Sequence, residues 1–132
     1  MIYAVLDTNI LVSVLLSKSA ESTISRLMHA VIDRKIIPMY SAEIIEEYRD
    51  VLSRDKFKFP QNLQNALMTY ILKNGIDSER VPFNDLMPDE DDRVFFEVTL
   101  SRDDAFLVTG NLRHFPVSPI VVSPAEMLEM LK

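Results

Sequence analysis

The chain contains no cysteine and only two glycines, Gly75 and Gly110, among its 132 residues. Without cysteine there is no disulfide, no thiolate metal site and no thiol nucleophile. The two isolated glycines exclude a Walker loop and a dinucleotide-binding fingerprint. No apolar run approaches the roughly 20 residues of a membrane helix, and the N-terminus lacks the features of a secretory signal. We therefore expect a cytoplasmic protein that does not enter a membrane.

Basic residues are also scarce, since 14 lysines and arginines face 20 acidic residues and the net charge is −6. Proteins that hold nucleic acid by bulk electrostatics usually carry a basic face, which this composition disfavours. An acidic enzyme can still act on phosphodiesters if its carboxylates bind cations and the cations bind the phosphates. The length and the 48% apolar content predict one domain covering residues 1–132.

The apolar pattern indicates strands that alternate with helices. The unbroken run Ile2 to Leu6 is typical of a strand covered on both faces. Similar short runs predict strands at 36–39, 105–109 and 120–122, with an edge strand at Val81–Phe83. The apolar run at 10–16 suits a buried helix, and helical periodicity or capping residues predict helices at 20–34, 42–54, 61–74 and 91–102 and a last helix that begins at Pro124. This alternation predicts a three-layer α/β/α domain of the α/β class, with a central, mainly parallel sheet.

Several residues whose side-chain oxygens could bind a metal occur at positions that a parallel sheet would bring to one edge. Asp7 follows the first strand, and Asn111 follows the strand at 105–109. Glu47 flanks the buried face of the helix at 42–54, and the run Asp89–Asp92 precedes the next helix. Ligands of open α/β sheets bind beyond the carboxyl ends of the strands. We therefore expect an acidic cluster there that holds Mg²⁺ or Mn²⁺.

Each of these residues also has a structural interpretation. The aspartates can cap the helices that follow them, Glu47 can pair with Arg54 or Lys18, and Asn111 can be a turn residue. His114 can contact a substrate or make a structural hydrogen bond.

Lys56 and Lys58 alternate with Phe57 and Phe59 along the chain. This pattern can bind single-stranded nucleic acid through phosphate contacts and stacking, but it is more often a helix end with a solvated face and two core aromatics.

Together the motifs resemble a PIN domain. They are Leu6-Asp7-Thr8-Asn9 after a strand, helical Glu47, Asp89-x-x-Asp92 before a helix, and Leu107–Asn111 followed by His114-Phe115-Pro116. The likeness is strongest to the prokaryotic toxins of toxin–antitoxin pairs, the VapC-like ribonucleases, and it covers nearly the whole chain. It implies a PIN-like α/β/α fold and Mg²⁺- or Mn²⁺-dependent hydrolysis of RNA.

The resemblance also implies roles for particular residues. Asp7, Glu47 and Asp92 correspond to catalytic, metal-binding acids, and Asn111 stands where many PIN domains have a fourth acid. The surrounding shell would comprise Asp89, Asp104, Thr109 and Asn9, and substrate contacts would come from His114, Lys56 and Lys58. Expected partners are RNA, an antitoxin protein and a second copy of the chain, paired through apolar residues of the helices at 20–34 and 61–74.

Two other functions remain open at this point. With Asn111 in place of an acid, the domain could bind RNA or a protein without cutting. A haloacid-dehalogenase-like phosphatase also places an aspartate after its first strand, but it needs a second aspartate at the position of Asn9.

Overall fold

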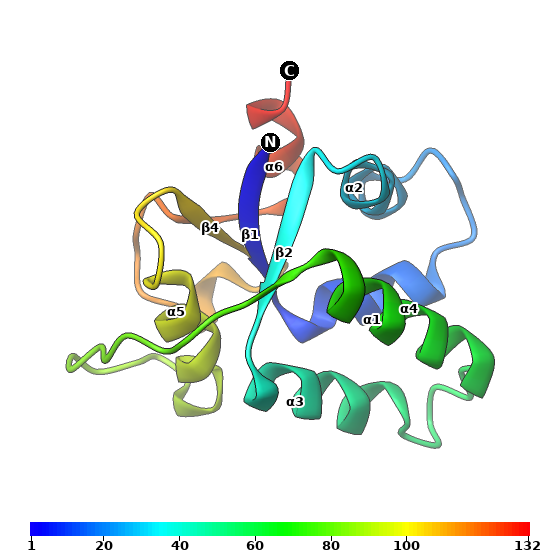
Figure 1. The fold of residues 1–132 in the computed structure, drawn as a ribbon, viewed down its shortest axis with the longest axis horizontal. Coiled ribbons are helices and arrows are strands. Elements are labelled where there is room, and N and C mark those ends of the chain that lie inside the picture. The colour runs from blue at the N-terminus through cyan, green and yellow to red at the C-terminus, as the bar shows by residue number, and fades with distance from the viewer.

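The computed structural model describes residues 1–132 and contains a five-stranded sheet whose neighbouring strands all run parallel (Figure 1). The strand order is β3-β2-β1-β4-β5, so β1 is central. The strands are β1 (Ile2–Leu6), β2 (Ile36–Tyr40), β3 (Ile76–Asp77), β4 (Ala105–Val108) and β5 (Val121–Val122). The parallel sheet predicted from the apolar runs is confirmed.

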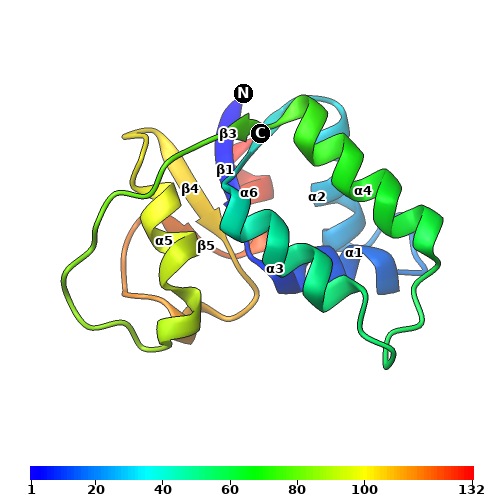
Figure 2. The same ribbon diagram turned by 60° about the horizontal axis from the view of Figure 1, so that its bottom comes forward.

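Helices cover both faces of this sheet. They are α1 (Thr8–Leu16), α2 (Thr23–Ile32), α3 (Ala42–Leu52), α4 (Gln61–Asn74), α5 (Arg93–Thr99) and α6 (Pro124–Met130), with 3₁₀ turns η1 (Glu90–Asp92) and η2 (Leu112–His114). Helix α5 packs against β1, β2 and β4 from one side, and α2 and α4 contact β2 from the other (Figure 2). The fold is thus the predicted α/β/α arrangement. None of the helices combines the length and the apolarity that crossing a bilayer requires.

Serine side chains begin three of the helices. The side chains of Ser22, Ser41 and Ser123 each accept a hydrogen bond from a backbone amide three residues later. The donors are the amides of Ser25, Ile44 and Glu126. These bonds satisfy amides that the first helical turn leaves without a partner.

The edge strand differs from the prediction. Val81–Phe83 is not a strand, because the amides of Val81 and Phe83 donate to the backbone oxygen and the Oε2 atom of Glu97, at 3.0 and 2.9 Å. Pro82 between them has no amide to offer a sheet. The edge strand is instead Ile76–Asp77, which pairs with the end of β2. Helix α5 is also shorter than predicted, spanning Arg93–Thr99.

The parallel arrangement places the ends of β1, β4 and β5 at one edge. The amide of Asp7, just after β1, donates to the carbonyl of Val108 at 2.9 Å. The amide of Thr109, just after β4, donates to the carbonyl of Val122 at 3.0 Å. Polar side chains that follow β1 and β4 therefore share the carboxyl edge of the sheet.

Candidate metal centre

Asp7 lies between β1 and α1 and is 4% exposed. It occupies the N-cap position of α1, but its side chain accepts no capping hydrogen bond. The hydroxyl of Thr109 donates to its Oδ2 atom at 2.7 Å. Burial raises the pKa of the Asp7 carboxyl above its usual value, and the bond from Thr109 offsets only part of that effect.

Glu47 reaches the same edge from α3. The hydroxyl of Thr8 donates to its Oε2 atom at 2.7 Å, which ties α3 to the first turn of α1. Its alternative partner Arg54 instead pairs with Asp50 at 3.2 Å. Burial raises the pKa of Glu47, and the negative charge of Asp7 raises it further. Glu47 is therefore close enough to Asp7 for their charges to interact.

Asp92 ends η1 and occupies the N-cap position of α5, where its side chain also caps nothing. Burial, followed by the charges of Asp7 and Asp89, raises its pKa to about 7. The charge of Glu47 acts on it in the same direction. Asp7, Glu47 and Asp92, from three different elements, thus contribute to one electrostatic site.

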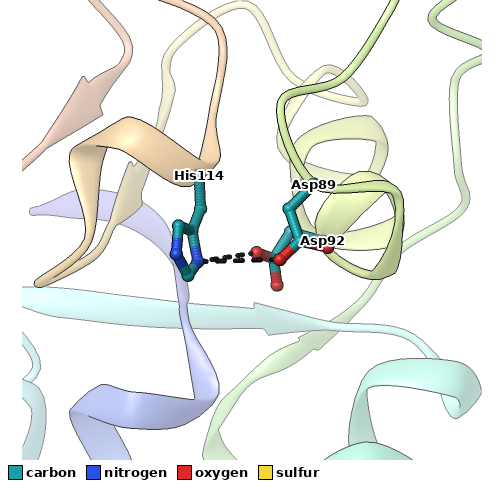
Figure 3. A group of neighbouring side chains, drawn as sticks. All are labelled: Asp89, Asp92 and His114. Carbon is teal, nitrogen blue, oxygen red and sulfur yellow. Dashed lines mark ion pairs between the residues drawn. The ribbon is translucent and has the colours of Figure 1, made fainter.

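Asp89 and His114 stand beside Asp92 (Figure 3). The Nδ1 atom of His114 lies 3.3 Å from Oδ2 of Asp92 and 3.9 Å from Oδ2 of Asp89. One ligand atom from each of the three residues falls within 4.8 Å of the other two, a group that does not include Asp7 or Glu47. The other oxygen of Asp89 accepts the amide of Asp91, so this residue does cap η1 as the structural interpretation predicted.

Thr109 and Asn111 connect the strand β4 to the site. Thr109 is fully buried, and its hydroxyl accepts the amide of Asn111 at 2.9 Å while donating to Asp7. The half-buried Asn111 precedes η2, and its side chain makes no capping bond there. The side-chain oxygen and NH₂ group of Asn111 make no hydrogen bond, whereas its backbone amide and carbonyl are bonded to Thr109 and His114.

Other residues expected at the site lie elsewhere or make no hydrogen bond or ion pair with it. Asp104 was expected near this edge, which is wrong, since it precedes β4 and pairs with Arg102 at 3.0 Å at the opposite edge of the parallel sheet. Asn9 is exposed. Lys56 and Lys58 are exposed beyond the end of α3, and no ion pair links them to the site.

Sequence reasoning missed two supporting residues. Thr8 holds Glu47, and the fully buried Tyr48 donates its hydroxyl to the carbonyl of Leu6 at 2.5 Å, directly before Asp7. Thr8 follows Asp7 in the chain, but nothing local indicates that its partner is Glu47. Tyr48 lies on the apolar stripe of α3, where an aromatic ring is indistinguishable from an ordinary core residue.

The donor set fits a divalent cation. It consists of carboxylate oxygens, one amide and one imidazole, and hard ions such as Mg²⁺ and Mn²⁺ take oxygen ligands. Burial and the charges of neighbouring acids raise the pKa values of Asp7, Glu47 and Asp92, so the charged forms of these side chains are disfavoured in the metal-free protein. A bound cation would stabilise the charged forms.

The chain is a parallel α/β domain whose acidic side chains gather at the carboxyl edge of the sheet. This arrangement is typical of α/β proteins that bind a ligand or a metal there. The family model described as PIN domain matches residues 3–113. The chain therefore belongs to the PIN domain family, as the motifs predicted. PIN domains are generally nucleases and typically use divalent metals. No curated protein and no solved structure matches the chain.

Proposed function

We propose that the protein is an endoribonuclease dependent on Mg²⁺ or Mn²⁺, and that it is the VapC-like toxin of a toxin–antitoxin pair. One observation carries the nuclease proposal. Asp7 and Asp92 occupy helix N-cap positions without capping, and both have raised pKa values in a site shared with Glu47. A cation bound among these acids would stabilise their charged forms.

Each side chain has a task in this proposal. Asp7 and Asp92 would hold the ion, with Glu47 and Asn111 completing its surroundings. When bound, the ion lowers the pKa of a water molecule and neutralises charge on the phosphate. Thr109 fixes one oxygen of Asp7, and Thr8 fixes Oε2 of Glu47. The Oε1 atom of Glu47 then remains to orient the attacking water.

A second candidate function is RNA or protein binding without cleavage. Asn111 supports it, because a neutral side chain stands where many PIN domains carry an acid. The phosphatase alternative is disfavoured by the family assignment and by Asn9, which is exposed and uncharged.

The partners are part of the proposal. RNA is the substrate, an antitoxin protein binds the chain, and two copies pair. Pairing is supported by exposed apolar residues on α2 and α4, among them Ile32 and Leu72. Lys56 and Lys58 are proposed RNA contacts. Reversing both charges should weaken RNA binding at low salt, and unchanged affinity in a filter-binding assay would remove them from the RNA surface.

An RNA cleavage assay tests the function directly. Wild type should cleave RNA with Mg²⁺ or Mn²⁺ and stop in chelator. Asp92→Asn should lower the rate by about 100-fold or more, equivalent to about 3 kcal/mol of transition-state stabilisation. Asp103→Asn, a neutralisation of an exposed acid near the opposite edge, is the matched control and should cleave normally. Chelator-resistant cleavage, or full activity of Asp92→Asn, refutes the proposal, and binding without cleavage supports the second candidate.

A further inference from the structure

We propose that His114 is a nitrogen ligand of the metal centre and makes the centre prefer Mn²⁺ to Mg²⁺. This inference rests on the proposed function and adds a ligand that the four acid positions of the family motif do not include. It follows from where the imidazole lies, from the bonds it does not make, and from the chemistry of its nitrogen.

The position of the imidazole suits a shared ion. Figure 3 shows the ring of His114 directed at the carboxylates of Asp89 and Asp92, with Nδ1 at 3.9 and 3.3 Å from their Oδ2 atoms. In an octahedral shell with bonds of about 2.1 Å, ligand atoms are about 3 Å apart when adjacent and about 4.2 Å apart when opposite. Both distances fall within that range, and one ligand atom from each of the three residues lies within 4.8 Å of the other two. An ion bound through Asp92 can therefore also contact Asp89 and His114 after movement of these side chains.

The imidazole has no other task in the structure. The sequence left open a structural hydrogen bond from His114, but neither ring nitrogen makes one, and the contacts with Asp89 and Asp92 are ion-pair distances only. The backbone is nevertheless well held. The amide of His114 donates to the carbonyl of Asn111 at 3.0 Å, and the next residue, Phe115, is buried in the core. The ring is thus delivered to the acids by a fixed turn, yet its nitrogens remain available.

The chemistry of nitrogen sets the metal preference. Mg²⁺ takes oxygen ligands almost exclusively and keeps several waters. Mn²⁺ also prefers oxygen and binds nitrogen least strongly among the first-row transition-metal ions, but unlike Mg²⁺ it has d orbitals that can accept an imidazole nitrogen. Asn111 offers no charge at the position of the usual fourth acid. His114, three residues further along the same loop, supplies a strong neutral donor instead. Such a donor strengthens Mn²⁺ binding more than Mg²⁺ binding.

Spectroscopy of the Mn²⁺-loaded protein tests the ligand directly. Electron spin-echo envelope modulation detects ¹⁴N bonded to Mn²⁺. We expect nitrogen modulation in wild type and its loss in His114→Ala. His29→Ala is the matched control, because His29 is the only other histidine and lies exposed on α2. It should retain the signal.

Isothermal titration tests the selectivity. Wild type should bind Mn²⁺ about tenfold more tightly than Mg²⁺, a difference of about 1.4 kcal/mol. His114→Ala should reduce that ratio to about threefold or less, chiefly by weakening Mn²⁺ binding, and His29→Ala should leave it unchanged. Mn²⁺ binding without nitrogen modulation overturns this inference, makes His114 a simple ion-pair partner of the acids, and leaves the proposed function standing. No binding of either ion at millimolar concentration overturns both.

Discussion

Asp92 carries a carboxylate that folding moves from water into the neighbourhood of other acids. Its pKa rises to about 7, first through burial and then through the charges of Asp7 and Asp89. In the unfolded chain the same group titrates near 3.8. The folded state therefore binds the proton more tightly, and the free energy of unfolding falls as pH rises from about 4 to about 7. At neutral pH this residue opposes folding.

We expect Asp92→Asn to stabilise the metal-free protein at pH 8, where the wild-type carboxylate is charged. The gain should be about 1–3 kcal/mol, since one pKa unit corresponds to about 1.4 kcal/mol. The advantage should shrink toward pH 4, where wild-type Asp92 is also neutral. Urea unfolding of both proteins at several pH values measures this trend. Equal stability of wild type and Asp92→Asn at pH 8 would mean that the folded protein does not disfavour the charged form of Asp92.

At the scale of elements, the end of α4 depends on a close approach of two backbones. A Cβ atom at Gly75 would lie 2.6 Å from the carbonyl oxygens of Ile71 and Pro38. Gly75 has an extended conformation (φ −91°) rather than a left-handed one, so the need for glycine comes from space and not from the backbone angle. The sequence correctly placed the end of the helix at Asn74-Gly75, but the reason involves β2, which is distant in the chain.

Gly75→Ala should therefore destabilise the protein by about 1–3 kcal/mol, the usual cost of forcing extra atoms into a packed site. Gly110→Ala is the matched control, because its Cβ would meet nothing within 4 Å and its backbone angle is compatible with alanine. It should stay within about 1 kcal/mol of wild type. Thermal unfolding of both variants compares them, and an equal effect of the two would contradict the close approach.

The segment that follows β3 is held by another element rather than by the sheet. Glu97 on α5 is 7% exposed, and it accepts from Phe83 and pairs with Arg80 at 2.8 Å. Arg80 also reaches Glu43 on α3 at 2.8 Å. Burial alone would raise the pKa of Glu97, but the bonds from Phe83 and Arg80 outweigh it and lower that pKa. This network joins α3, which contains Glu47, to α5, which directly follows Asp92.

At the scale of the whole molecule, metal binding and folding should be linked. A ligand that binds only the folded state at 100 times its Kd adds about 2.7 kcal/mol of stability, or about 10 °C in Tm for a chain of this size. We expect Mn²⁺ to raise Tm by about this amount in wild type and in Asp103→Asn, and chelator to reverse it. Asp7→Asn should lose the shift. A metal-independent Tm in wild type would contradict the linkage.

What the sequence determined by itself is local. The run Ile2 to Leu6 specified a buried strand, 3.6-residue periodicity specified the helices, and Ser41 and Ser123 marked where two of them begin. The strand ends also located Asp7 and Asn111 at one edge. These features depend on bonds and periodicities that span only a few residues, so they are visible in the chain.

Only the tertiary structure decided which of these side chains meet. Thr109 bonds to Asp7 across 102 positions, and Thr8 bonds to Glu47 across 39. Asp104 was predicted at the wrong edge. It is close to Thr109 in the sequence, but it precedes β4 while Thr109 follows it, so the two residues lie at opposite ends of the strand. These contacts between residues far apart in the sequence follow from the strand order β3-β2-β1-β4-β5 and from the approach of α3 and α5 to the carboxyl edge. No local pattern encodes that order, because it is set by how all the elements pack together.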